Sequence, residues 1–178
     1  MARPARRLRN FDAYWKMEAA NVVFVPSLAL ALGWPRDGVE ASALGLAIVA
    51  AAGFLVVGTF FWRGVDRRLR FADRVAARRA LDFADRVERP LVVICGAAVA
   101  ATVAALMLNG WTPAVIAATA LSALAALEYV NYYHWQLQHF DNIADLKRLF
   151  SGRGGRASHM ARDLAARRRA RPAARTGP

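Results

Sequence analysis

Four polar side chains that can bind an ion or move a proton recur at spacings of three or four residues near the end of an apolar run. They are Glu128, Asn131, His134 and Gln138. At about 100° per residue, such spacings place all four within an arc of about 120° on one face of a helix. A carboxylate, an imidazole and two amides on one face could hold a cation, a proton or a lipid headgroup.

A second polar pair lies near the N-terminus. The segment Glu18-Ala-Ala-Asn21 has the same spacing as Glu128-Tyr-Val-Asn131, and both pairs lie in predominantly apolar segments. Two helices packed at the same depth would bring two carboxylates and two amides into one cluster. The candidate ligand-binding or ion-binding residues are therefore Glu18, Asn21, Glu128, Asn131, His134 and Gln138.

Three interpretations of this cluster are open from the sequence. The carboxylates can be structural groups, hydrated or paired with nearby cations, that hold the helices in register. They can instead form a binding site, because an ionisable side chain within a membrane segment is costly and often functional. The third interpretation is a metal-dependent enzyme with a divalent cation at His134 and Glu128, since imidazole and carboxylate are suitable metal ligands.

Motifs give the enzyme interpretation little support. The chain has no His-Glu-x-x-His or Glu-x-x-His sequence, no Walker motif, no nucleophile elbow, no dinucleotide fingerprint and no zinc cluster. His134 and His139 are five residues apart, or about 140° around a helix, so they do not readily share one ion. No catalytic residue is assigned. The single cysteine, Cys95, lies in an apolar run and is interpreted as a packing residue.

Four apolar runs must position the polar side chains. They cover about residues 17–34, 41–62, 90–108 and 112–134, and each is close to the ~20 residues that a helix needs to cross a membrane. The chain is 57% hydrophobic yet carries 25 Lys and Arg, which suits a protein whose charges are confined to the links between spans. The sequence predicts an all-α, integral membrane four-helix bundle with four transmembrane helices. The competing class is an Ala-rich soluble helical bundle.

The distribution of charge predicts the orientation. Of the 25 Lys and Arg, only Arg36 lies in a link on the side opposite the termini. The positive-inside rule therefore places both termini and the long link in the cytoplasm of a bacterial-type inner (plasma) membrane. Trp15, Trp34, Trp62 and Trp111 lie near predicted span ends, where indole rings favour the headgroup layer.

Outside the spans, the sequence predicts a basic cytoplasmic arm (1–16) and a helical link (63–89). The four-span domain (17–150) ends in an extension of the last helix (135–150), and a basic disordered tail (151–178) follows, with room for a short helix at 160–169. The link is either two extensions of the flanking spans joined near Arg78–Leu81 or one amphipathic surface helix. It contains a repeat, Phe71-Ala-Asp-Arg-Val75 and Phe83-Ala-Asp-Arg-Val87.

These features favour a small polytopic inner-membrane protein with a non-enzymatic binding or accessory role. The expected partners are the bilayer, anionic lipid headgroups, and a second copy of the chain or another membrane protein. The sequence argues against nucleic acid as a partner, because no aromatic residue follows Phe150 in the basic tail and no RNA-binding signature is present. The alternative is a metal-dependent membrane enzyme acting on lipid headgroups.

Overall fold

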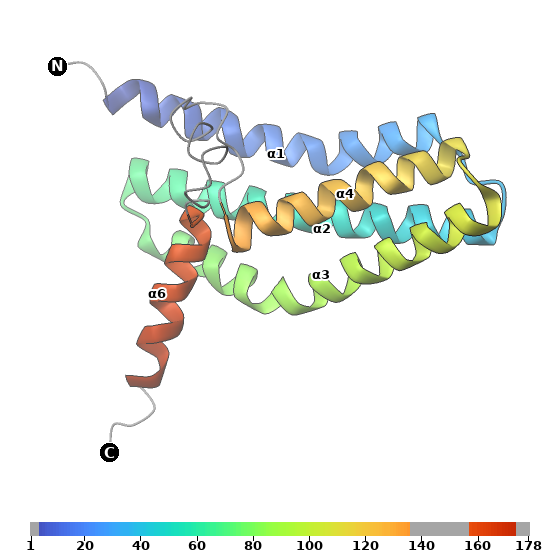
Figure 1. Cartoon of the computed structure of the whole chain (residues 1–178). Coiled ribbons are helices and arrows are strands. Elements are labelled where there is room, and N and C mark those ends of the chain that lie inside the picture. The colour runs from blue at the N-terminus through green and yellow to red at the C-terminus, as the bar shows by residue number, and fades with distance from the viewer. Residues whose placement is uncertain (1–3, 136–156, 174–178) are drawn as a thin grey trace, which may run out of the picture. The chain divides into compact units, whose positions relative to one another are not determined.

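The computed structural model describes residues 4–135 and 157–173, and these residues are almost entirely helical. Within them there is no β-strand, only an isolated antiparallel bridge between Trp135 and Ala157. The helices are α1 (Pro4–Leu32), α2 (Gly38–Phe71), α3 (Arg74–Asn109), α4 (Pro113–Tyr133) and α6 (His159–Ala173) (Figure 1). The predicted all-α fold is confirmed.

Helices α1 to α4 are each long and apolar enough to cross a membrane. Helix α2 has 34 residues and α3 has 36. At about 1.5 Å per residue both exceed 50 Å, whereas the hydrocarbon layer is about 30 Å thick. Large apolar side chains such as Phe24, Val93 and Met107 are exposed on the helix surfaces, as expected of lipid-facing positions. The prediction of four helices long and apolar enough to span a membrane is confirmed.

The chain divides into two compact units, residues 1–126 and 127–178. In the first unit, α2 packs against both α1 and α3. The buried face of α2 combines alanines and glycines with larger apolar side chains, among them Phe54 and Phe61. Small side chains let helix backbones approach closely, and such packing is a main source of helix association in lipid. At Gly64 a Cβ atom would lie 3.0 Å from the Cβ of Ala80, so this position requires glycine or a shift of α3.

The link between the second and third spans is two helical extensions, which is the first of its two predicted forms. The position predicted for the turn, Arg78–Leu81, is wrong: α2 continues to Phe71 and α3 begins at Arg74. Ala72 has φ 55° and ψ 21°, in the left-handed region, and its N–H donates to the carbonyl of Arg67. The Asp73 carboxylate accepts from the N–H of Ala76 at 2.9 Å and caps α3. Local capping therefore fixes the turn six residues before the predicted place.

The described part of the N-terminal arm is helical, because α1 begins at Pro4 and continues into the first candidate span. The prediction that residues 1–16 form a basic cytoplasmic arm stays a prediction. Proline suits the first turn of a helix because its missing N–H would have no partner there.

In the second unit, α4 ends at Tyr133 and does not continue into the predicted extension at Trp135. The N–H groups of His134 and Trp135 both donate to the carbonyl of Val130, at 3.0 and 2.7 Å, which closes the last turn. The remaining extension, residues 136–150, lies outside the described residues. Ser158 supports this helix end: its N–H donates to the carbonyl of His134 at 3.1 Å, and its hydroxyl donates to the carbonyl of Tyr132.

The prediction of a disordered tail at 151–178 is wrong for its described part, because α6 covers His159–Ala173. The Ser158 hydroxyl accepts from the N–H of Ala161 at 3.0 Å and caps this helix. The alanines, arginines and Leu164 that follow are strong helix formers. The cap accounts for the start of the helix at His159, and the helix formers that follow favour its continuation beyond the 160–169 segment that the sequence allowed.

Candidate functional site

The predicted polar cluster is divided between the two units. Glu18 and Asn21 belong to the first unit, on α1. Glu18 is 2% exposed, and Asn21 is half-buried. Glu18 is a buried carboxylate on a predicted span. An ionisable side chain within a membrane segment is costly, so its presence supports a structural or binding role for Glu18.

The other described members belong to the second unit. The Asn131 amide donates to Glu128 at 3.4 Å, so these two side chains share a face of α4. Asn131 is buried and Glu128 is half-buried. His134 is exposed in the turn after α4, and its ring lies edge-on to Tyr129 with the centroids 4.9 Å apart. Gln138 and His139 lie outside the described residues. The joining of Glu18 with Glu128 in one site stays a prediction.

A divalent metal at His134 and Glu128 also stays a prediction. Within residues 4–135 and 157–173, no three His, Cys, Asp or Glu side chains are grouped so that they could hold a metal ion. His134 and Glu128 would therefore need a further ligand from another source.

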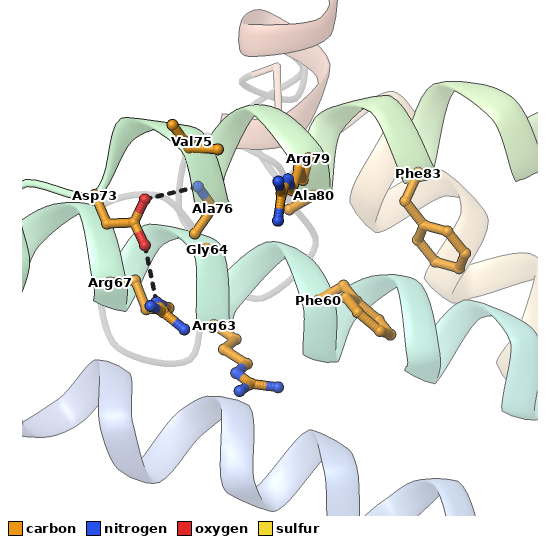
Figure 2. A pocket seen from close by; sticks show the side chains of 10 residues that line it. All are labelled: Phe60, Arg63, Gly64, Arg67, Asp73, Val75, Ala76, Arg79, Ala80 and Phe83. Atoms are coloured by element: carbon orange, nitrogen blue, oxygen red, sulfur yellow. Dashed lines mark hydrogen bonds and ion pairs between the residues drawn. The ribbon is translucent and has the colours of Figure 1, made fainter.

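A pocket that the sequence did not predict lies between α2 and α3, at the base of their turn (Figure 2). Its volume is about 270 Å³. The side chains that line it combine three arginines and one carboxylate with apolar groups: Phe60, Arg63, Gly64, Arg67, Asp73, Val75, Ala76, Arg79, Ala80 and Phe83. A pocket with basic and aromatic walls can bind a molecule that has both an anionic and an apolar part.

The charges of the pocket are only partly balanced. Arg67 pairs with Asp73 at 3.0 Å. The N–H of Ala76 and the Arg67 guanidinium hold the pKa of the Asp73 carboxyl below its ordinary value of 3.8. Within the described part of the chain, neither Arg63 nor Arg79 forms an ion pair with a carboxylate. The guanidinium of Arg63 instead lies 5.7 Å from the ring centre of Trp15 on α1. Among the residues whose side chains are described, Arg79 is therefore a cation of the pocket without a paired carboxylate.

The apolar wall of the pocket is a contact between two aromatic rings. Phe60 on α2 and Phe83 on α3 have ring centres 5.0 Å apart. Phe60 is 47% exposed. In Figure 2, Arg79 points from α3 toward α2 and lies between this aromatic pair and the Arg67–Asp73 pair. The pocket thus has a charged end and an apolar end.

One signal in the sequence could have drawn attention to this place. The five-residue repeat of the link supplies Asp73 and Val75 from its first copy and Phe83 from its second. The repeat alone does not indicate a pocket, because the pocket depends on which residues of α2 lie beside α3.

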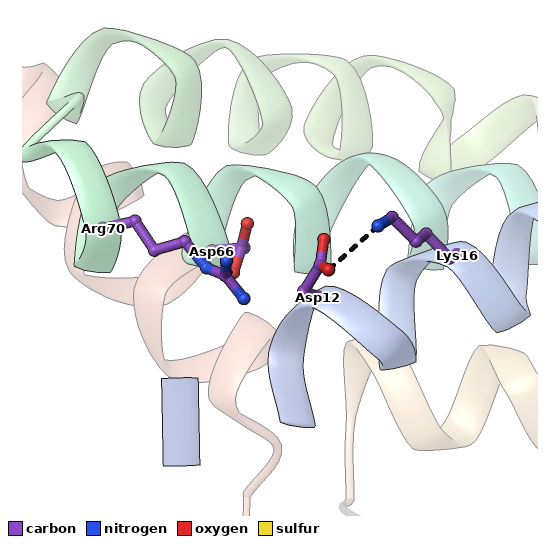
Figure 3. Close-up of polar contacts among 4 residues, drawn as sticks. All are labelled: Asp12, Lys16, Asp66 and Arg70. Carbon is purple, nitrogen blue, oxygen red and sulfur yellow. Dashed lines mark hydrogen bonds and ion pairs between the residues drawn. The ribbon is translucent and has the colours of Figure 1, made fainter. Parts of the chain in front are cut away.

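Two other ion pairs near this end each join residues of a single helix. Lys16 pairs with Asp12 on α1 at 2.9 Å, and Arg70 pairs with Asp66 on α2 at 2.7 Å (Figure 3). Both pairs are four residues apart, which is the usual spacing for helix ion pairs. These side chains have an evident structural role, in contrast to Arg79.

A buried polar network lies at the opposite end of the first unit, where the α1–α2 and α3–α4 turns meet. Glu40 is 1% exposed and accepts from the N–H of Arg36 and the hydroxyl of Thr112, each at 2.8 Å. Asp37 caps α2 and accepts from the amide of Asn109 at 2.7 Å. The N–H of Glu40, together with the Asn109 amide, holds the pKa of the Asp37 carboxyl below its ordinary value. The hydrogen bonds from Asn109 to Asp37 and from Thr112 to Glu40 join the two turns, and both carboxylates have donors.

Comparison of the chain with protein-family models, with curated proteins and with solved structures found no match.

Proposed function

We propose that this chain is a four-span protein of a bacterial-type inner (plasma) membrane, with both termini in the cytoplasm, and that it is a non-enzymatic accessory protein. Its activity is the binding of anionic lipid headgroups at its cytoplasmic boundary. In the membrane it would assemble with a second copy or with another membrane protein, because four helices leave little room for an enclosed path of their own.

The charge asymmetry supports this orientation. The turn joining α2 and α3 is flanked by many arginines, whereas the two turns at the other end contain Arg36 alone. Cytoplasmic links carry the excess of Lys and Arg in membrane proteins. The α2–α3 turn is therefore the cytoplasmic one in this proposal.

The length of the α2–α3 hairpin supports a binding role. Both helices are longer than the hydrocarbon layer is thick, and the first charged residue after the apolar run of α2 is Arg63. The hairpin beyond this residue would stand in the headgroup layer and the adjoining cytoplasm. Arginines at this depth attract anionic lipids with about 1 kcal/mol each.

The observation that carries the proposal is the pocket between α2 and α3. It lies at the level of Arg63, where α2 changes from apolar to charged residues, and it combines a basic end with an aromatic end. Basic pockets between membrane helices on the cytoplasmic side are suited to anionic lipid headgroups.

The proposal is tested by measuring which lipids surround each end of the protein. Two variants keep a single tryptophan, Trp62 near the hairpin or Trp111 at the opposite end, with phenylalanine at the remaining positions Trp15, Trp34 and Trp135 and at the other member of the pair. Each is reconstituted in mixed vesicles in which either the anionic or the zwitterionic lipid is brominated, and quenching of the indole fluorescence is compared.

At about 0.1 M salt, we expect the brominated anionic lipid to quench Trp62 fluorescence several-fold more strongly than the brominated zwitterionic lipid. The difference should be smaller at about 0.5 M salt, because salt screens exposed charges. Trp111 is the matched control and should show no such preference. Equal quenching of Trp62 by the two lipids would refute the proposed binding of anionic headgroups.

A further inference from the structure

We propose that the pocket between α2 and α3 holds one anionic phospholipid, with its phosphate bound by Arg79 beside Arg67 and its glycerol and acyl end against Phe60 and Phe83. This inference rests on the proposed function and adds to it a defined site. A bound lipid of this kind differs from a diffuse layer of anionic lipid because it depends on particular side chains.

The basic end of the pocket fits a phosphate. A guanidinium offers several N–H donors in a fixed plane, which suits phosphate oxygens. Arg67 already donates to Asp73, so its position is fixed by an ion pair at 3.0 Å. Arg79 has no carboxylate partner among the described residues and points into the space between the two helices (Figure 2). With Arg79 uncompensated and Arg63 also lining the pocket, the site carries a net positive charge.

The apolar end distinguishes a lipid from a soluble phosphate. Phe60 and Phe83 line the pocket together with Val75, Ala76 and Ala80, and Phe60 is half exposed. A free phosphate ion would leave this surface in contact with water. The glycerol and first acyl carbons of a phospholipid would cover it and gain about 25 cal/mol for each Å² of apolar surface removed from water.

The size of the pocket limits what it can enclose. About 270 Å³ is near the lower end for ligand pockets. This volume suits the phosphate and the glycerol part of a lipid, while the acyl chains extend along the outside of the helices. The hydrophobic length of the neighbouring helices provides a surface for those chains.

The test is native mass spectrometry of the full chain released from nanodiscs that contain phosphatidylcholine with a minor share of phosphatidylglycerol. The wild type is compared with Arg79→Gln and with Arg74→Gln as the matched control. Arg74 is an exposed arginine of the same hairpin that does not line the pocket. Circular dichroism and the thermal midpoint establish that each variant is folded, and Arg79→Lys, which keeps the charge, serves if Arg79→Gln does not fold.

We expect the wild type and Arg74→Gln to retain one phosphatidylglycerol, and Arg79→Gln to bind it about five- to tenfold more weakly, as the loss of one charged contact near a membrane implies. Arg79→Lys should bind the lipid more weakly than the wild type because a lysine cannot reproduce the planar contact. The inference is overturned if Arg79→Gln and Arg74→Gln reduce lipid binding equally, or if neither does so.

A second arm adds inorganic phosphate in the millimolar range to the wild-type protein. We expect the retained lipid to stay bound. Displacement of the lipid by inorganic phosphate would show that the site recognises the ion alone and would overturn the lipid assignment. If Trp62 prefers anionic lipid equally with Arg79 and with Gln at that position, this inference is refuted and the proposed function stands. If the protein with the native Arg79 shows no such preference, both are refuted.

Discussion

The two ends of the first unit use polar side chains in opposite ways. At the end formed by the α1–α2 and α3–α4 turns, the buried Glu40 accepts from the backbone N–H of Arg36 and the hydroxyl of Thr112, and Asp37 accepts from the amide of Asn109. At the end formed by the α2–α3 turn, Arg67 has a carboxylate partner but Arg79 has no ion-pair partner among the described residues. We call the first end closed, because both of its carboxylates have hydrogen-bond donors, and the second end open, because Arg79 in its pocket pairs with no described carboxylate.

This difference separates polar groups that hold the fold from polar groups that can take a ligand. A buried carboxylate is tolerated when hydrogen bonds satisfy it, and removing its partners then costs stability. An exposed arginine that lines a partly apolar pocket, and that pairs with no described carboxylate, has N–H donors available to an anionic ligand. We therefore expect substitutions at the closed end to change stability and substitutions at the open end to change lipid binding.

The largest effect is expected from Glu40→Ala, which breaks the closed end. The substitution leaves the Thr112 hydroxyl and the Arg36 N–H without their acceptor and should lower the free energy of unfolding by about 2–4 kcal/mol. The measurement is unfolding of the purified protein in mixed micelles. Glu40→Gln is the matched control, because it keeps one carbonyl oxygen and should lose about 1–2 kcal/mol. If Glu40→Ala lowers the free energy of unfolding by less than Glu40→Gln does, the hydrogen bonds to Glu40 do not hold the two turns together.

Gly64→Leu is expected to disturb the open end, because a side chain there meets the Cβ of Ala80 at 3.0 Å and the Cα of Ala77 at 3.2 Å. Forcing α2 and α3 apart should lower the free energy of unfolding by about 1–3 kcal/mol. It should also reduce retention of phosphatidylglycerol, because the pocket lies at this contact. Gly45→Leu on the same helix is the control, since a Cβ there meets nothing within 4 Å. If Gly64→Leu and Gly45→Leu have equal free energies of unfolding, the close approach of α2 and α3 at Gly64 is contradicted.

A smaller effect is expected between the two ends, where Thr102 and Ser122 share a buried hydrogen bond at 3.2 Å. A double-mutant cycle with Thr102→Val and Ser122→Ala should give a coupling of about 0.6 kcal/mol, as is usual for such bonds inside membranes. Lipid binding should not change. A coupling of zero would show that the hydroxyl groups contribute nothing to the packing of α3 on α4 in the first unit.

The smallest effect is a dependence on pH at the α2–α3 turn. The pKa of Asp73 lies below 3.8 in the folded protein, so its interactions stabilise the turn above about pH 4 and are lost as the pH falls through the lowered pKa. Asp73→Asn should therefore show a smaller decrease of the thermal midpoint than the wild type between pH 5 and about pH 2.5. Parallel profiles for the two proteins would contradict the cap and ion pair described for Asp73.

The sequence was sufficient to predict the spans, because hydrophobic length is a strong and local signal. The turn at Ala72 and Asp73 was not predictable, since alanine is an unusual residue for the left-handed region and the link offers several aspartates as caps. The helix α6 was missed because its cap, Ser158, is an ordinary serine in a stretch rich in glycine and arginine.

The two polar sites of the first unit depend on contacts between residues far apart in the chain. Glu40 and Thr112 are 72 residues apart, and nothing near Glu40 in the sequence indicates that it is buried. The pocket depends on the register that brings Phe60 beside Phe83. Conversely, the cluster proposed from spacing at Glu18 and Glu128 is still a prediction, because helical periodicity places side chains on a face but does not show which faces meet.

The most direct test of the account is the side of the membrane on which each end lies. Single cysteines replace Arg74 at the open end or Trp111 at the closed end, in a chain that carries Cys95→Ser, and intact cells are treated with a membrane-impermeant maleimide. We expect the cysteine at position 111 to be labelled in intact cells. The cysteine at position 74 should be labelled only in inverted membrane vesicles. The reverse pattern would place the arginine-lined pocket outside the cell and contradict the proposed cytoplasmic site.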